Sequence, residues 1–242
     1  MKKLDFTEAE AALRRAAAAA GKSHLLDVTR DDMFSEDFIG GSEETYAKLR
    51  VKGYLSSLPE GLRGMTFDSW EARDGASEQV ARAREWSGTG HTCGLFIHSE
   101  EPGNGKTHLA VACGRVMAEN GHAAAYMNAV SLIEKIKLGF GKEHPAVDVQ
   151  RIGSMYDALI LDDLGAEKPG EWVSQQLYLL VNTAVTNRTR LIVTSNLSYG
   201  EIDTALGPRI ADRLYGATIE LSLDGVSSYR HKQHKENQQC GT

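Results

Sequence analysis

The chain has 242 residues, of which 41% are hydrophobic and 25% are charged, so it can bury the core of one α/β domain with a smaller part attached. No apolar run approaches the roughly 18 residues that a membrane helix needs, and charge interrupts the N-terminal alanines, so we expect a cytoplasmic chain without a signal peptide. The net charge of −6 argues against a protein that coats nucleic acid over its whole surface, while it permits a local basic groove.

The first 57 residues are expected to form a small helical region that binds a partner. Thr7 and Glu10 have the spacing of a capping box and Gly21 supplies a stop, which predicts a helix over 8–20. Its apolar side is mostly alanine, so this helix should dock on another surface rather than build a core. A second short helix is expected over 43–52. Between them, the acidic stretch DVTRDDMFSEDFIGG either orders on a partner or folds over the main domain, and both interpretations stay open.

From residue 58 to residue 230 the sequence alternates short apolar runs with helical patterns, which is typical of an α/β domain. Five strands are expected, over 95–98, 123–127, 158–161, 191–194 and 218–221. Five helices are expected, over 77–86, 106–120, 131–138, 171–187 and 208–214. The last residues, 231–242, are polar and are expected to form a frayed tail.

A phosphate-binding loop is predicted where the apolar run GLFI leads through GNGKT into a helical run. Glycines let backbone N–H groups approach phosphates, and the helix N-terminus adds a partial positive charge. Lys106 would reach the β- and γ-phosphates of ATP, and the Thr107 hydroxyl would bind Mg²⁺. The predicted nucleotide-binding residues are Gly103, Asn104, Gly105, Lys106, Thr107 and His108.

A second motif, ALILDDLGAE, has four apolar residues of a buried strand followed by two carboxylates. Asp162 would hold Mg²⁺ through water, and Asp163 would polarise the attacking water. The third apolar strand, LIVTSN, places Asn196 where it could orient that water. Further on, Arg209 and Arg213 lie at i and i+4 on one face of a short helix, from which a guanidinium could reach a phosphate across a subunit boundary. Solvated strand-end carboxylates and surface arginines are the alternatives.

In this order, the motifs TFDSW, GNGKTHLA, LILDDLGAE, TSN, RIADRL and SYR resemble the AAA+ ATPases of the DnaC and DnaI helicase-loader group, with the transposition helper IstB as a close relative. The resemblance covers roughly 58–230. It implies a P-loop AAA+ domain with a parallel sheet in the order 5-1-4-3-2 between helices, and an N-terminal region that grips the replicative helicase. The residue roles that it implies are Lys106 and Thr107 as Walker A, Asp162 and Asp163 as Walker B, Asn196 as sensor 1, Arg213 rather than Arg209 as arginine finger, and Arg230 as sensor 2.

Two departures from the family pattern stand out. Glu100 replaces the first glycine of the phosphate loop and Glu101 adds a second carboxylate, so we expect ATP to bind with reduced affinity. The cysteines, Cys93, Cys113 and Cys240, are too far apart for a C-x-x-C pair, which places this chain nearer the loaders that lack a zinc module.

The segment SLIEKIKLGFGKEHPAVDVQR lies where initiator-type AAA+ loaders insert a helix that lines the pore of the assembly. Lys135, Lys137 and Lys142 would contact phosphates of single-stranded DNA, and Phe140 would stack on a base. The alternative is an amphipathic helix with solvated lysines and three buried side chains, Leu132, Ile133 and Ile136.

We therefore predict a weak, Mg²⁺-dependent ATPase that loads a hexameric replicative helicase of the DnaB type onto single-stranded DNA and assembles with itself on ATP and DNA. Its short N-terminal region suggests a phage or mobile-element origin. An IstB-like transposition helper has the same ATPase core but serves a transposase. A P-loop phosphotransferase and a non-hydrolysing adapter are alternatives from other classes.

Overall fold

The computed structural model describes residues 43–229, apart from 89, 140–146 and 167–168. The helix expected over 8–20, the tail and the predicted site residues Phe140, Lys142 and Arg230 lie outside the described residues. Within the described part, no helix is both long enough and apolar enough to cross a membrane.

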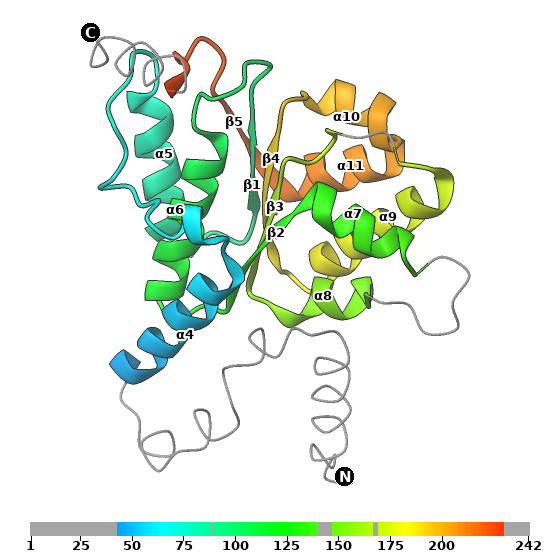
Figure 1. Cartoon of the computed structure of the whole chain (residues 1–242), viewed down its shortest axis with the longest axis horizontal. Helices are drawn as coiled ribbons and strands as arrows, with labels where there is room; N and C mark the ends of the chain where they lie inside the picture. The colour runs from blue at the N-terminus through cyan, green and yellow to red at the C-terminus, as the bar shows by residue number, and fades with distance from the viewer. Residues whose placement is uncertain (1–42, 89, 140–146, 167–168, 230–242) are drawn as a thin grey trace, which may run out of the picture.

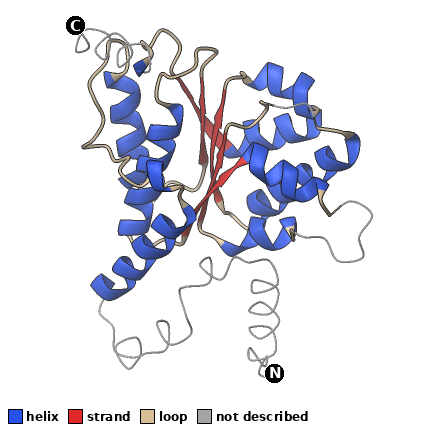
Figure 2. Cartoon of the chain, viewed as in Figure 1, coloured by secondary structure: helices blue, strands red, loops and turns tan. Residues whose placement is uncertain are grey.

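Five parallel strands form one sheet between two layers of helices (Figures 1 and 2). The strands are β1 (Gly94–His98), β2 (Ala124–Asn128), β3 (Ala158–Asp162), β4 (Arg190–Ser195) and β5 (Thr218–Ser222). Their order across the sheet is β5-β1-β4-β3-β2, which confirms the predicted order. In the register, Leu95 of β1 lies opposite Ile192 of β4 and Ile219 of β5. Parallel strands end at the same edge, so the polar residues that follow β1, β3 and β4 are brought together.

Helices cover both faces of the sheet because the central strands are apolar on both sides. In β1, Leu95 and Ile97 belong to one buried cluster and Phe96 to the other, as the alternation of a strand requires. One layer holds α4 (Glu43–Ser57), α5 (Ser77–Gly88) and α6 (Lys106–Glu119). The other holds α7 (Ala129–Lys137), α8 (Val149–Met155), α9 (Glu171–Thr186), α10 (Tyr199–Leu206) and α11 (Pro208–Ala217).

Each strand and helix predicted between 77 and 221 is present, with ends that differ by a few residues, but two short helices were missed. Helix α10 begins with a capping box in which Ser198 and Glu201 satisfy each other's backbone N–H groups, a signal that is visible in the sequence. Helix α8 is capped by the preceding residue Asp148, whose side chain accepts a hydrogen bond from the backbone N–H of Arg151. Both helices are too short to show a clear apolar period.

Helix α4 is longer than the helix predicted over 43–52, and its C-terminal half packs on the core. Tyr54 is fully buried, and its hydroxyl donates to the carbonyl oxygen of Val111 in α6 at 2.8 Å. Gly114 permits this approach, because a Cβ there would lie 2.6 Å from the Tyr54 hydroxyl. Ser57 Oγ accepts a hydrogen bond from the backbone N–H of Tyr126, on the outer edge of β2. These contacts make the last turns of α4 part of the core's packing, directly before the boundary at residue 58 that the sequence predicts for the ATPase domain.

Candidate nucleotide-binding site

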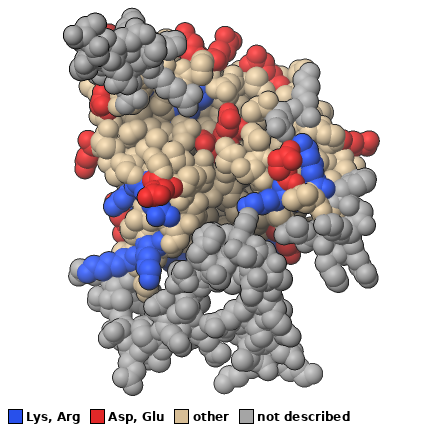
Figure 3. Space-filling view, in the orientation of Figure 1, with Lys and Arg blue, Asp and Glu red and all other residues tan. Residues whose placement is uncertain are grey.

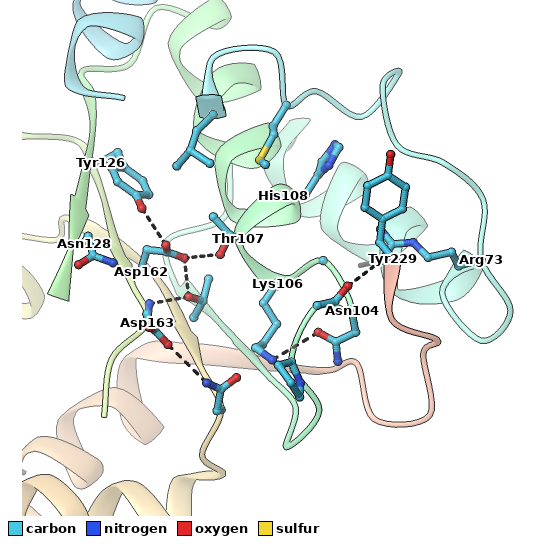
Figure 4. Close-up of a pocket in the computed structure, with 17 residues that line it drawn as sticks. Arg73, Asn104, Lys106, Thr107, His108, Tyr126, Asn128, Asp162, Asp163 and Tyr229 are labelled. Atoms are coloured by element: carbon cyan, nitrogen blue, oxygen red, sulfur yellow. Dashed lines mark hydrogen bonds between the residues drawn. The ribbon is translucent and has the colours of Figure 1, made fainter. Parts of the chain in front are cut away.

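A cavity of about 460 Å³ lies at the ends of β1, β3 and β4, beside the N-terminus of α6 (Figure 4). Its polar end is lined by Asp162, Asp163 and Asn196, which lie at the ends of β3 and β4. The loop between β1 and α6 forms its floor. A cavity of this size and mixed lining is suited to a nucleotide-sized ligand.

The loop before α6 has the backbone geometry of a phosphate-binding loop. Gly103 and Gly105 have φ angles of 81° and 103°, in the left-handed region that glycine enters without cost. A Cβ on Gly105 would lie 2.4 Å from the ring of Trp70, so a larger residue does not fit there. Helix α6 begins at the next residue, so its free N–H groups and dipole point at the loop.

The Lys106 ammonium group is held inside this loop. The residue is 8% exposed, and Nζ donates to the carbonyl oxygens of Ser99 at 3.0 Å and Glu101 at 2.9 Å. It also lies 3.3 Å from Oδ1 of Asn104. The residue lines the cavity, so a phosphate on the loop would meet a cation that is already oriented.

Asn104 and His108 line the cavity, but their side chains are engaged within the protein. The buried amide of Asn104 donates to Ser99 Oγ and to the carbonyl oxygen of Leu223, which ties the loop to the segment after β5. Nε2 of His108 lies 2.8 Å from the carbonyl oxygen of Thr66. Burial lowers the pKa of His108, so the imidazole is neutral at pH 7. The sequence pattern identified both positions without showing these internal partners.

The Asp162 carboxylate is 5% exposed and accepts hydrogen bonds from three hydroxyl groups. Oδ1 accepts from the Oγ1 atoms of Thr107 and Thr194, at 2.8 and 2.7 Å. Oδ2 accepts from the Tyr126 hydroxyl at 2.7 Å (Figure 4). Burial raises the pKa of Tyr126 and the nearby Asp162 charge raises it further, so the phenol keeps its proton and donates.

The structure thus brings the predicted metal ligands Thr107 and Asp162 together across 55 residues of sequence. Their donor set, a hydroxyl and a carboxylate oxygen, is of the kind that Mg²⁺ takes. Thr194 and Tyr126 were not predicted. Thr194 stands in the quoted TSN motif, whereas Tyr126 lies in an ordinary apolar strand and carries no local signal.

Asp163 and Asn196 are brought together at the ends of β3 and β4. Asn196 Nδ2 lies 3.5 Å from Asp163 Oδ1, and both residues line the cavity. Asp163 has a φ of 62°, which is uncommon for a residue other than glycine and costs about 1 kcal/mol. Its backbone N–H donates to Thr194 Oγ1 at 2.8 Å, which helps to hold this conformation.

The other end of the cavity is apolar and aromatic, and sequence reasoning missed it. Leu62 and Met65 line the cavity, and so do Arg73 and Tyr229, which lie beside each other in Figure 4. The Arg73 guanidinium lies 4.1 Å from the centroid of the Trp70 ring, and burial lowers its pKa. The backbone N–H of Tyr229 donates to the carbonyl oxygen of Gly103 at 2.9 Å, which places its ring beside the loop.

Comparison with known proteins agrees with this site. A model of the IstB-like ATP-binding protein family matches residues 85–237. The chain belongs to this family. Its sheet and helices also match the fold of the solved DnaC and DnaI structures.

Relatives of this IstB-like chain include proteins from two processes. It is 24% identical over 184 residues to the replicative helicase loader DnaC of Buchnera aphidicola subsp. Baizongia pistaciae, with 74% of each chain covered. It is 28% identical over 200 residues to a putative insertion sequence ATP-binding protein of Sinorhizobium fredii, covering 78% of this chain and 65% of that protein.

Solved structures show the same fold at low identity. The DnaC helicase loader superposes with a TM-score of 0.60 at 21% identity, covering 68% of this chain and 99% of that one. AMPPCP-bound DnaA from Aquifex aeolicus superposes with a TM-score of 0.56 at 22% identity, covering 72% of this chain and 54% of that one.

The other predicted residues that the structure of this IstB-like chain describes lie outside the cavity. Arg209 and Arg213 are exposed on α11, and neither is among the described residues that line the cavity. Lys135 and Lys137 are exposed on α7, and Lys137 donates to Glu134 at 2.7 Å. On the face seen in Figure 3, basic side chains lie in separate groups with acidic ones between them rather than in one band.

Glu100 is exposed, and it does not line the cavity. Its backbone N–H donates to Asp224 Oδ1 at 3.3 Å, which anchors the start of the loop to the segment after β5. A carboxylate in solvent is screened, so its effect on a nearby phosphate is small. The reduced ATP affinity that we predicted stays a prediction, with a modest expected size.

Replacing Lys106 by alanine should abolish detectable ATP binding, because it removes the cation held over the loop. We expect an affinity loss of about 100-fold or more, since a charge-assisted contact to phosphate is lost from a buried site. Isothermal titration calorimetry measures it. Lys135→Ala, which removes an exposed lysine outside the cavity, is the matched control. Native affinity in Lys106→Ala would exclude this cavity as the ATP site.

Glu100→Gln should tighten ATP binding by no more than about fivefold, because a screened surface charge is worth about 1 kcal/mol or less. The gain should shrink as salt rises. Glu100→Gly, which also frees the backbone, should bind at least as tightly. Titration at low and high salt measures this, with the exposed Glu85→Gln as control. Identical affinities of the native, Gln and Gly proteins at low salt would show that this carboxylate does not act on the nucleotide.

Proposed function

We propose that this chain is an ATP-dependent loader of a hexameric replicative helicase, acting in the cytoplasm. ATP binding favours an assembly of subunits that grips single-stranded DNA and the open helicase ring, and hydrolysis releases them. The observation that carries the proposal is the phosphate loop facing the Thr107–Asp162 pair, 2.8 Å apart, in a chain with helicase loaders among its relatives.

The residues of the cavity divide the chemistry between them. Thr107 and Asp162 would hold Mg²⁺, which neutralises charge on the phosphates when it is bound. Lys106 binds the β- and γ-phosphates from the other side. Asp163, which follows the C-terminal end of β3 in a left-handed backbone conformation, polarises the attacking water. Asn196 orients that water.

The base of the nucleotide fits the opposite end of the cavity. Leu62 and Met65 offer an apolar face, and the Arg73 guanidinium and the Tyr229 ring offer planar groups on which a base can stack. Arg230, which we assign as sensor 2, follows directly after Tyr229 in sequence. This arrangement orients the triphosphate toward Asp162.

Contacts with DNA and with further subunits use surfaces outside the cavity. The exposed Lys135 and Lys137, with Phe140 beyond them, bind single-stranded DNA through phosphates and base stacking. The exposed Arg213 acts as an arginine finger on the nucleotide of a neighbouring subunit. The N-terminal region, residues 1–57, binds the helicase.

A transposition helper is the second candidate, because relatives with insertion-sequence names reach higher identity. The insertion sequence IS21 putative ATP-binding protein of Pseudomonas aeruginosa is 30% identical over 140 residues, with 56% of this chain and 52% of that protein covered. Such a helper would use the same ATP site but serve a transposase on duplex DNA. A phosphotransferase is disfavoured, since the chain belongs to an ATP-binding family whose fold neighbours are replication proteins.

Asp163→Asn should bind ATP with native affinity and slow its hydrolysis by about 100-fold or more, because the metal ligands remain while the base is lost. The ATP-loaded variant should therefore stay bound to helicase and single-stranded DNA longer than the native protein. Co-purification of tagged native, Asp163→Asn and Lys106→Ala proteins from host cells, with and without ATP, measures this. Capture of a transposase in place of the helicase would support the second candidate. Helicase binding that is equal in all three proteins would contradict an ATP switch.

Arg213→Ala should lower hydrolysis by about 1,000-fold in the assembled state while leaving ATP affinity unchanged, since a finger acts on the neighbour's nucleotide. Mixing Arg213→Ala with Asp163→Asn protein should restore activity at interfaces that pair an intact Asp163 with an intact Arg213. Phosphate release measured across mixing ratios is the test, and Arg209→Ala is the matched control on the same helix. No recovery at any ratio would argue against a role in trans.

A further inference from the structure

The Asp162 carboxylate is held from both sides, and its two oxygens have different partners. Oδ1 accepts from two threonine hydroxyls, those of Thr107 and Thr194. Oδ2 accepts from the phenol of Tyr126 at 2.7 Å. Since an aspartate carboxylate turns easily about its last single bond, donors on both oxygens are needed to fix its plane.

Tyr126 is itself firmly placed. It lies in the middle of β2, opposite Ile160 of β3 in the parallel register, and is 8% exposed. Its backbone N–H donates to Ser57 Oγ at 3.0 Å, so α4 fixes the strand on its outer edge. The side chain lines the cavity and points at Asp162 (Figure 4). A donor held this rigidly can determine where the carboxylate points.

We propose that Tyr126 is a positioning residue, which orients the Asp162 carboxylate so that the Thr107–Asp162 pair binds Mg²⁺ tightly. This inference rests on the proposed ATP-binding function, because Mg²⁺ arrives with ATP. Hydrogen-bond partners of metal ligands commonly change metal affinity by about 10- to 100-fold when they are removed. Tyr126 stands in that relation to Asp162, although it belongs to none of the sequence motifs.

The alternative is that the phenol only satisfies a buried carboxylate and stabilises the fold. Tyr126→Phe separates the two, because it removes the hydroxyl and keeps the ring that packs in the core. A structural role predicts a lower unfolding temperature with an unchanged Mg²⁺ requirement. A positioning role predicts a raised Mg²⁺ requirement with unchanged binding of metal-free ATP.

The experiment uses the full chain as native, Tyr126→Phe and Tyr199→Phe proteins. Tyr199 is the matched control, since its hydroxyl bonds to Thr218 Oγ1 at 2.6 Å, its partly buried ring packs against the other buried cluster and the residue does not line the cavity. A fluorescent ATP analogue is bound first in EDTA and then at increasing Mg²⁺, and the Mg²⁺ concentration at half effect is recorded. Thermal unfolding of each protein is measured first, and all titrations are run below the lowest midpoint.

We expect Tyr126→Phe to raise the half-effect Mg²⁺ concentration by about 10-fold or more, with EDTA binding within about twofold of native. Tyr199→Phe should match native in both. Equal Mg²⁺ midpoints for native and Tyr126→Phe would overturn the positioning role while leaving ATP binding intact. If the native protein bound no analogue with or without Mg²⁺, the proposed function would fall and this inference with it.

Discussion

The buried carboxylate of Asp162 links three elements that are distant in the sequence. It accepts hydrogen bonds from hydroxyl groups in the first turn of α6, at the end of β4 and in the middle of β2. Burying a carboxylate that is only 5% exposed would destabilise the fold without such donors. The same three hydrogen bonds therefore stabilise the fold and fix the geometry of the site. Because the donors come from separate elements, the helix that carries Lys106 and the strands that carry Asp162 and Thr194 are held in one arrangement before any ligand binds.

The phosphate loop depends on a second set of long-range contacts. Its glycines make it conformationally free, and residues after β5 remove much of that freedom. Asn104 donates to the carbonyl oxygen of Leu223, and Tyr229 donates from its backbone to Gly103. The same segment thereby places the Tyr229 ring at the apolar end of the cavity. Residues at the end of the described chain thus shape a loop near its middle.

Helix α4 connects the region proposed to bind the helicase with both sides of the ATP site. Tyr54 contacts the helix that follows the phosphate loop, and Ser57 holds the edge of the strand that carries Tyr126. The residues before α4, for which we propose helicase binding, are thereby connected through this helix to both sides of the cavity. Its contacts are buried and hydrogen-bonded, so α4 is part of the domain's structure rather than a flexible link.

Much of the fold and of the polar half of the cavity could be predicted from the sequence. Apolar runs that end in carboxylates, and a glycine-rich run that opens a helix, are local patterns, so they predicted the strands, Lys106, Thr107, Asp162 and Asp163. Only the tertiary structure identified Tyr126, Arg73 and Tyr229 as parts of the cavity, and only it showed Glu100 in solvent. Their roles depend on which side chains of distant elements point at one place. Packing between segments determines which side chains line the cavity, so no periodicity or motif within a single segment can predict them.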